Sequence, residues 1–319
     1  MADFTPFSIL VIGGTGTIGQ FITSSILRAQ PHFPSVTLFT SPTTARTKAA
    51  QLAKWQALGL KVKVGDISSE RDVAAAFADA DTVVSALGRG ALQLQLDLLR
   101  LAEASGTVRW FFPSEYGTDI EHNDRSPDER PHQVKLAVRR YVREEVKRVR
   151  VTYVVTGPYF DMWVGALPGA ELAGGFVTEK KEAYLIGGSE KVGFCTMWDV
   201  GKAVVAALRH PSASFNKALK VQSFVVAPAV VLAEYERQTG AKWSVTETPL
   251  ETIRKLETEA WAEGSPVATG FTLRRIWAEG GTLYEENDNA VIGLGEGDME
   301  TLETGVRRAL GGGWTEEEV

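Results

Sequence analysis

The stretch SILVIGGTGTIGQFI, residues 8–22, decides the fold of this chain. An apolar run typical of a buried strand meets Gly13, and a helical pattern begins directly after Gly19. In such a turn Gly13 permits the tight bend, Gly16 lets the backbone approach a pyrophosphate, and Gly19 lets helix and strand pack closely. We interpret the stretch as a dinucleotide-binding turn, in preference to a glycine-rich connection without a ligand.

Strands and helices alternate through the first half of the chain, which is typical of βαβ units and a parallel sheet. The apolar character of nearly all the strands predicts burial on both faces. The fold class expected is therefore α/β, a doubly wound parallel Rossmann sheet. The strands are expected at 8–12, 36–39, 61–64, 82–86, 108–112 and 152–156, and the helices between them at 18–29, 45–58, 72–78, 92–104 and 133–149.

The pattern changes after residue 156 to GPYFDMWVGALPGAELAGG, which cannot continue a regular helix and suggests the wall or lid of a site. Residues 1–156 are expected to form the dinucleotide-binding domain. Residues 157–319 are expected to form mainly a smaller α/β substrate domain, with a strand at 220–226 and helices at 229–239 and 249–261. Within it, 194–210 predict a strand, an Asp199 cap and a helix that return to the main sheet.

The composition is that of an ordinary globular protein and disfavours several classes of function. The chain has 319 residues, 44% of them hydrophobic and 23% charged, and its net charge of -6 gives no general attraction for nucleic acid or anionic lipid. The chain has no apolar run of about 18 residues, so no membrane span is predicted, and the N-terminus does not resemble a secretion signal. The single cysteine, Cys195, fits a reducing compartment, so a cytoplasmic protein is expected. Four scattered histidines and one cysteine predict no metal site.

The end of the second strand, LFTSPTTARTKAAQ, favours NADP(H) as the dinucleotide. It has no acidic residue to hold the ribose diol of NAD. Thr40 and Ser41 instead offer hydroxyl donors, and Arg46 and Lys48 offer positive charge for a 2′-phosphate. The alternative is that both bases only solubilise the start of a helix.

Two further strand ends, VVSALG (83–88) and FFPSEYG (111–117), should lie beside the same ligand. In open α/β sheets ligands collect outside the carboxyl ends of the strands, although each of these segments alone could be an ordinary strand-to-loop junction. The residues expected to bind the cofactor are Gly13, Thr15, Gly16, Thr17, Ile18, Gly19, Thr40, Ser41, Arg46, Lys48, Ala86, Leu87, Gly88, Pro113, Ser114, Lys135 and Tyr159.

These residues together resemble the NmrA-like, isoflavone-reductase-like branch of the atypical short-chain dehydrogenases/reductases. The resemblance rests on GGTGTIG, FFPSEYG, KLAVRRYVRE (135–144) and VTGPYFDMW (155–163), and it covers most of the first half of the chain. The second half is similar only in outline. The family implies NADPH-dependent reduction of phenolic or other secondary metabolites, with a conserved lysine near the reacting centre. In this sequence that lysine is Lys135.

Lys135 is the candidate catalytic residue, because a lysine near the nicotinamide can orient a water, bond a ribose hydroxyl or neutralise an oxyanion. It lies next to the predicted buried stripe of the helix, which includes Val134 and Val138. The alternative is that Lys135 is an ordinary surface lysine, because the helix carries many other basic residues. Pro131 stands where conventional short-chain reductases carry a tyrosine, which excludes their Ser-Tyr-Lys device. His132 is a second candidate acid or base, with a structural role as the favoured alternative.

The substrate is expected to be a flat, apolar small molecule. Glu115 and Tyr116 follow the fifth strand, and Phe160 and Trp163 come from the aromatic segment after the sixth. Each has a structural alternative: Glu115 could brace its loop, and the aromatic residues could be core between domains.

Two hypotheses follow for the function. The first is a reductase acting on a C=C, C=N or C=O bond of an aromatic or alkaloid-like metabolite, in one variant followed by ring closure in the same pocket. The second is a non-catalytic NADP redox sensor or transcriptional co-regulator, as some relatives of this branch are. The fold alone cannot separate them. The possibility that the protein forms a homodimer is left open.

Overall fold

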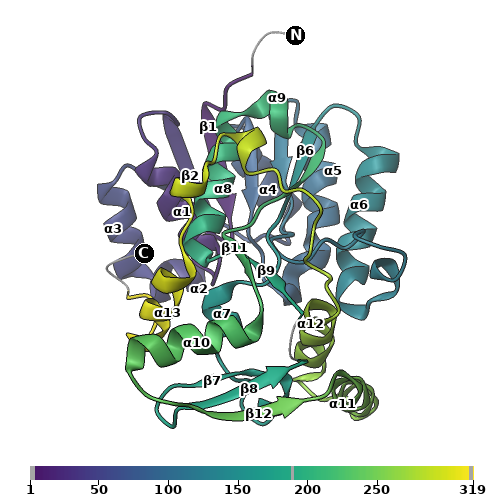
Figure 1. Ribbon diagram of the computed structural model, residues 1–319. Helices are drawn as coiled ribbons and strands as arrows, with labels where there is room; N and C mark the ends of the chain where they lie inside the picture. The colour runs from purple at the N-terminus through teal and green to yellow at the C-terminus, as the bar shows by residue number, and fades with distance from the viewer. Residues whose placement is uncertain (1–3, 188–189, 316–318) are drawn as a thin grey trace.

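The main sheet of the protein is parallel throughout and has the strand order β10-β6-β5-β4-β1-β2-β3 (Figure 1). The computed structural model describes residues 4–187, 190–315 and 319. The order reverses between β1 and β4, which confirms the predicted doubly wound Rossmann class. The strands are β1 Ser8–Ile12, β2 Ser35–Thr40, β3 Lys61–Val64, β4 Thr82–Ser85, β5 Trp110–Phe112, β6 Arg150–Val155 and β10 Lys217–Lys220.

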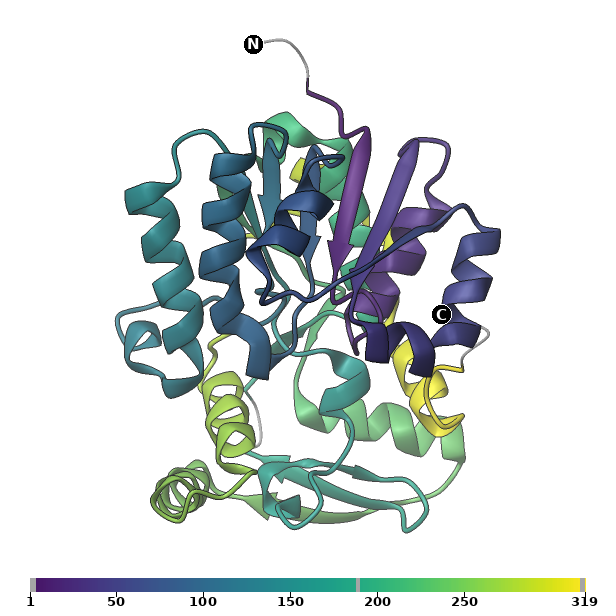
Figure 2. The same cartoon turned by 180° about the vertical axis from the view of Figure 1, so that it is seen from behind.

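Helices cover both faces of this sheet (Figures 1 and 2). Alternate residues of β1 show why its sequence is a continuous apolar run. Ile9 and Val11 belong to one buried cluster, and Leu10 and Ile12 belong to the other. The first cluster includes residues of α1 (Gly19–Arg28), α3 (Ala49–Ala57) and α8 (Met197–Arg209), and the second includes residues of α4 (Glu70–Phe77), α5 (Gln95–Ser105) and α6 (Gln133–Glu145).

β3 does not follow the expectation of burial on both faces. Lys61 and Val64 are exposed, because β3 is the outermost strand beside β2 and its charged residues face water. The expected helix 45–58 is also divided, into α2 (Pro42–Thr47) and α3. Ser41 caps α2 by accepting a hydrogen bond from the Thr44 amide at 3.1 Å, so the helix begins earlier than the periodicity indicates.

The glycine turn is built as its sequence predicts. Gly13 has a φ of +75°, and a Cβ there would lie 2.6 Å from the carbonyl oxygen of Ala86 at the end of β4. A Cβ on Gly19 would overlap the carbonyl oxygen of Gly13. Any side chain at either position would therefore push apart β1, β4 and α1 at the point where the strand order reverses.

The chain after β6 departs from three expectations. Thr196, not Asp199, caps α8, because the Thr196 hydroxyl accepts from the Asp199 amide at 3.2 Å. The helix α8 returns to the main sheet and packs against α1. The strand before it, β9 (Val192–Phe194), instead pairs with β11 (Phe224–Val226) in a separate two-stranded sheet. The expected strand 220–226 is divided between β10 and β11, and β10 is the strand that joins the main sheet.

A smaller part lies at the carboxyl ends of the main strands (Figures 1 and 2). Its three-stranded sheet has the order β12-β8-β7, and Phe160, Phe176 and Tyr235 belong to its buried cluster. Among the described residues, no helix is long and apolar enough to cross a membrane. The remaining strands and α-helices are β7 Gly175–Val177, β8 Glu182–Ile186, β12 Ser244–Thr248, α7 Phe160–Trp163, α9 Pro211–Ser214, α10 Pro228–Thr239, α11 Leu250–Ala262, α12 Ala268–Ala278 and α13 Leu302–Leu310. The short 3-10 helices are η1 Arg89–Leu94, η2 Ser126–Asp128, η3 Arg130–His132, η4 Glu171–Ala173, η5 Ala290–Ile292 and η6 Glu296–Asp298.

Candidate functional site

A cavity of about 450 Å³ lies between the carboxyl ends of the main strands and the smaller part. Its position is the one at which open α/β sheets bind ligands. The segments that line it are the β1–α1 turn, the loops after β4 and β5, the start of α6, the segment around α7, and one face of α12. The cavity therefore joins the glycine turn to the lysine helix and to the smaller part.

The end of the cavity at the glycine turn fits a dinucleotide pyrophosphate. Within the described residues no side chain caps α1, whereas Thr196 caps α8. The amides of Gln20 and Ile22 already donate to the carbonyls of Gly16 and Ile18, so an anion here would be bound by the other amides of the turn and of the start of α1. Gly16 and Thr17 are exposed there, and Thr23 holds the turn by donating a hydrogen bond to the Gly14 carbonyl at 3.2 Å.

The expected cofactor residues fall into two groups. Those that line the cavity are Gly16, Thr17, Ile18, Ala86, Leu87, Gly88, Ser114, Lys135 and Tyr159. Those outside its wall are Gly13, Thr15, Gly19, Thr40, Ser41, Arg46, Lys48 and Pro113. Gly13 and Gly19 shape the turn without lining the cavity. Ser114 joins two strand ends, because its hydroxyl donates to the Leu87 carbonyl at 2.8 Å.

The four expected residues at the end of β2 lie on and beside α2. Thr40 is buried, and the Ser41 hydroxyl is used as the cap of α2. Arg46 and Lys48 are exposed, and no ion pair joins either of them to another part of the chain that the structure describes. Their charges are therefore available to an anionic group at this end of the sheet.

Lys135 lies at the start of α6 and lines the cavity. Its ammonium donates a hydrogen bond to the backbone carbonyl of Glu115, which fixes the lysine against the loop after β5. Burial lowers the pKa of Lys135 to about 8, and the nearby charge of Arg89 acts in the same direction. The lysine is thus a cation at neutral pH that gives up its proton more readily than an exposed one.

His132 lines the same cavity one turn earlier. Its Nδ1 lies 2.7 Å from the carbonyl oxygen of Ser126, and because a carbonyl only accepts, Nδ1 carries the proton. Nε2 is buried and has no hydrogen-bond partner among the described residues. Burial lowers the pKa of His132, so the ring is neutral at pH 7 and Nε2 is an acceptor.

Glu115 lines the cavity, but both oxygens of its carboxylate are bonded to Arg139. The Nε–Oε1 distance is 2.8 Å and the Nη2–Oε2 distance is 2.6 Å, and both side chains are buried. This bidentate pair ties the loop after β5 to α6. The geometry favours the bracing role for the Glu115 carboxylate over direct substrate contact.

Tyr116 and Tyr159 line the cavity together. The Tyr159 hydroxyl donates to the Tyr116 carbonyl at 2.6 Å, which closes the loop after β5 against the segment after β6. Tyr116 has a φ of +27°, which is rare outside glycine, and its buried hydroxyl has no partner among the described residues.

Of the two aromatic residues expected at the substrate, only Trp163 lines the cavity. Phe160 is fully buried in the core of the smaller part, with its ring 5.5 Å from that of Phe194, so its assignment to the substrate is not supported by the geometry. Trp163 belongs to the same buried cluster, with its ring 4.8 Å from that of Phe194, but it also lines the cavity. Met162, also on α7, is 57% exposed and does line the cavity.

Sequence reasoning missed the wall formed by α12. Gly270, Leu273, Arg274 and Trp277 line the cavity, and their spacing is that of one helical face. A signal was present in the sequence: FTLRRIWA has two adjacent arginines inside a mostly apolar helical pattern. Neighbouring residues of a helix point in different directions, so the pattern indicates that one of the two arginines faces inward.

The described residues contain no group of three or more histidine, cysteine or acidic side chains placed to hold a metal ion. Cys195 is buried, and its thiol donates to the Val221 carbonyl at 3.1 Å. Burial raises the pKa of this thiol, so it is not an activated nucleophile.

Comparison with known proteins gives a consistent set of relatives. A model of the NmrA-like family matches residues 7–271. An isoflavone reductase from Pisum sativum is 27% identical over 265 residues, which cover 79% of this chain and 81% of that protein. The phenylcoumaran benzylic ether reductase Pyrc5 from Pyrus communis is 29% identical over 218 residues, which cover 67% and 68% respectively. The binary complex of leucoanthocyanidin reductase and NADPH from Vitis vinifera has a TM-score of 0.79, with 18% identity and coverage of 95% of this chain and 99% of that one.

Proposed function

This chain belongs to the NmrA-like family, and on that premise we propose that it is an NADPH-dependent reductase of an aromatic secondary metabolite. The hydride acceptor is a C=C, C=N or C=O bond of a substrate held beside Lys135. Membership of the family confirms the resemblance drawn from GGTGTIG, FFPSEYG and KLAVRRYVRE. The observation that carries the proposal is a single cavity lined both by the uncapped turn of α1 and by Lys135, whose pKa is lowered to about 8.

The assignment of NADPH as the cofactor is supported by the glycine turn and by the relatives. The glycine turn before α1 is the candidate site for the pyrophosphate, and Arg46 and Lys48 are the candidates for the 2′-phosphate. A leucoanthocyanidin reductase of the same fold is solved with NADPH. When bound, NADPH supplies the hydride, and the protein contributes orientation, charge and protons.

Lys135 is the residue that stabilises charge and supplies a proton. Its Nζ is a cation at neutral pH and is oriented by the Glu115 carbonyl, so it can neutralise negative charge that develops on a substrate oxygen or nitrogen. A pKa near 8 also suits proton donation from Nζ to that atom. The Glu115–Arg139 pair fixes the carbonyl that positions the lysine.

The aromatic nature of the substrate is supported by the part of the cavity wall that α7 and α12 form. Trp163, Leu273 and Trp277 offer apolar surface across the cavity, with the exposed thioether of Met162 at its edge. Relatives named for reactions of isoflavones and phenylcoumarans act on aromatic compounds, which agrees with such a wall.

The test begins with fluorescence titration of the purified protein with NADPH and with NADH. The expected result is a clear preference for NADPH, followed by oxidation of bound NADPH when unsaturated aromatic metabolites are supplied. Lys135→Met should retain NADPH binding and lose turnover by about a hundredfold or more, the usual scale for removal of a general acid. NADPH binding without consumption by any compound of the panel would favour the redox sensor instead.

A further inference from the structure

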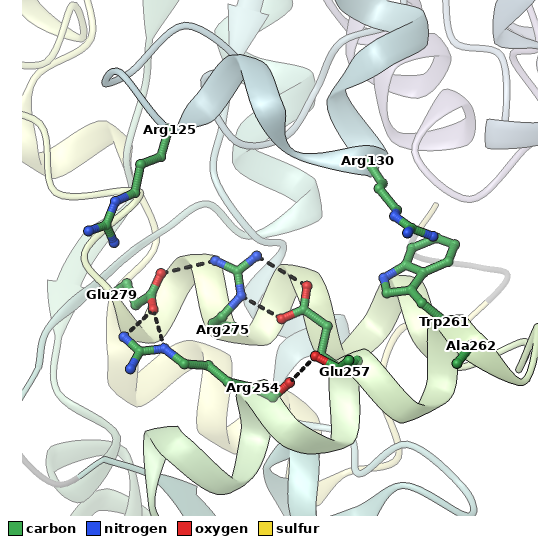
Figure 3. A pocket seen from close by; sticks show the side chains of 9 residues that line it. Arg125, Arg130, Arg254, Glu257, Trp261, Ala262, Arg275 and Glu279 are labelled. Carbon is green, nitrogen blue, oxygen red and sulfur yellow. Dashed lines mark hydrogen bonds and ion pairs between the residues drawn. The ribbon is translucent and has the colours of Figure 1, made fainter.

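Arg274 and Arg275 are adjacent on α12 but have opposite surroundings. Arg275 is bonded to Glu129, Glu257 and Glu279, and Figure 3 shows it extended between the last two. Arg275, Glu257 and Glu279 line an open groove of about 760 Å³ on the outside of α11 and α12, where the carboxylates are already paired. Arg274 lines the cavity of the proposed active site and forms no ion pair with any described carboxylate.

Arg274 is almost completely buried, with an exposed fraction of 4%. Its Nη2 donates to the Gly165 carbonyl at 3.0 Å, whereas Nη1 has no partner in the part of the chain that the structure describes. Its central carbon lies 5.2 Å from the ring centroid of Trp163 and 5.9 Å from that of Trp277. The two indoles therefore hold the cation in place without neutralising it.

A buried cation without a counter-ion is costly, so its presence requires an explanation. Burial lowers the pKa of Arg274 to about 9, which still leaves the side chain charged at neutral pH. The obvious substitute in a purely structural wall would be an apolar residue of similar length, which has no desolvation cost.

None of the described residues that line the cavity supplies an anion for this cation. Lys135 and Arg89 are cationic, His132 is neutral, and both oxygens of Glu115 are bonded to Arg139. Arg274 also borders a small adjoining cavity of about 20 Å³, whose wall includes the exposed Glu190, but no ion pair joins these two side chains. The missing negative charge must therefore come from a ligand.

We propose that Arg274 binds a carboxylate of the substrate, so that the substrate class is an aromatic carboxylic acid. This inference rests on the proposed function, because it assigns the cavity to the substrate of the reductase. The planar guanidinium matches a carboxylate in shape and offers the free Nη1 donor. The aromatic body of the acid packs against Trp163, Leu273 and Trp277 while its reacting bond faces Lys135.

The cofactor phosphates are a less suitable partner for Arg274. The uncapped end of α1 and the bases after β2 belong to the main sheet, whereas Arg274 is presented by α12 of the smaller part. This distinction can be measured directly, because a phosphate contact would make NADP⁺ binding itself depend on Arg274.

The experiment measures binding, by calorimetry, of benzoate, trans-cinnamate and 2-naphthoate to the protein saturated with NADP⁺, each against its uncharged amide. The proteins are the wild type, Arg274→Met, Arg274→Lys and the charge control Arg307→Met, which alters an exposed arginine of α13. In the wild type and the control, at least one acid should bind about tenfold or more tightly than its amide. Arg274→Met should abolish that preference, and Arg274→Lys should retain part of it.

Three results would overturn the proposal: equal binding of acids and amides, no binding of any of the six compounds, or a preference that persists in Arg274→Met. Weaker NADP⁺ binding by Arg274→Met would also overturn it in favour of a cofactor phosphate contact. Thermal melts check folding, and Arg274→Met should be at least as stable as the wild type because a buried unpaired charge is removed. The assay needs no hydride transfer, so its failure is distinguishable from failure of the reductase proposal.

Discussion

Arg275 of α12 donates a hydrogen bond at 2.7 Å to Glu129, which lies 146 positions earlier in the chain and directly before η3. Both side chains are largely buried, with exposed fractions of 14% and 15%. Since η3 leads into α6, this pair connects the smaller part to the segment that carries His132 and Lys135. The wall of the cavity and the candidate catalytic residue are thereby held in one relative position.

Breaking this connection should weaken substrate binding more than cofactor binding. Arg275→Met leaves the carboxylates of Glu129 and Glu257 unpaired and should lower the free energy of unfolding by about 1–3 kcal/mol. We expect a higher KM for the aromatic substrate and an almost unchanged Kd for NADPH, measured by steady-state kinetics and fluorescence titration. Arg307→Met is the matched control. Equal losses of both affinities would contradict a role confined to the substrate side.

The reductase should lose activity on the alkaline side of pH 8. The pKa of Lys135 is lowered by burial to about 8, so its ammonium is present at pH 7 and is lost as the pH rises through that value. The value of kcat/KM should therefore be constant from about pH 6 to 7 and should fall tenfold per unit well above pH 8. A Lys135→Arg variant keeps its charge, so its residual activity should lack this decline. A profile of the same shape in that variant would assign the titration to another group.

Small side chains in the glycine turn should abolish cofactor binding. Gly13→Ala places a Cβ 2.6 Å from the Ala86 carbonyl oxygen at a positive φ, and we expect loss of NADPH binding together with a lower melting temperature. Gly90→Ala is the control, because a Cβ at that position meets nothing within 4 Å. Wild-type affinity in Gly13→Ala would show that the turn tolerates a shift of β1 relative to β4.

The buried pair of Glu115 and Arg139 should be among the most sensitive sites for stability. Arg139→Met leaves the Glu115 carboxylate buried and without its bidentate partner, which costs about 3–5 kcal/mol. Urea unfolding measures this loss, with Arg143→Met as the control, since Arg143 is 58% exposed and pairs with the exposed side of Glu121. A loss below about 1 kcal/mol in Arg139→Met, the level of a surface ion pair, would contradict the bracing role.

Selectivity for NADPH should depend on the two bases after β2. Arg46→Ala and Lys48→Ala each remove one exposed positive charge without altering the cap of α2 at Ser41. The variant that removes the phosphate contact should lose about tenfold or more of its affinity for NADPH and almost none for NADH. Fluorescence titration of both variants identifies the base. Unchanged ratios in both, and in the double variant, would mean that other groups read the 2′-phosphate.

The parts of the structure that could be predicted depend on local chemistry. The turn at Gly13 and Gly19 is recognisable because its conformation and close approaches exclude side chains, whatever the rest of the chain does. The alternation of apolar strands and helices likewise follows from periodicities of a few residues. The first residues of helices were predicted less well where a capping side chain, and not hydrophobic periodicity, sets the start of the helix, as at Ser41 before α2 and Thr196 before α8.

The side chains that face the cavity were decided by contacts between distant segments. Trp163 lines the cavity and Phe160 does not, although both belong to one buried cluster and both rings contact that of Phe194, which lies far along the chain. The carboxylate of Glu115 is occupied by Arg139, a residue 24 positions later, which no local pattern specifies.

The sequence by itself determined the doubly wound sheet, the family and the dinucleotide turn, since backbone geometry and hydrophobic periodicity are properties of neighbouring residues. The tertiary structure alone decided that Arg274 lines the cavity while Arg275 is bonded to Glu129. Adjacent arginines are chemically identical in the sequence. They differ only in the folded protein, where the two sides of α12 face different parts of the chain. Burial and ion pairing then depend on which distant groups surround each charge.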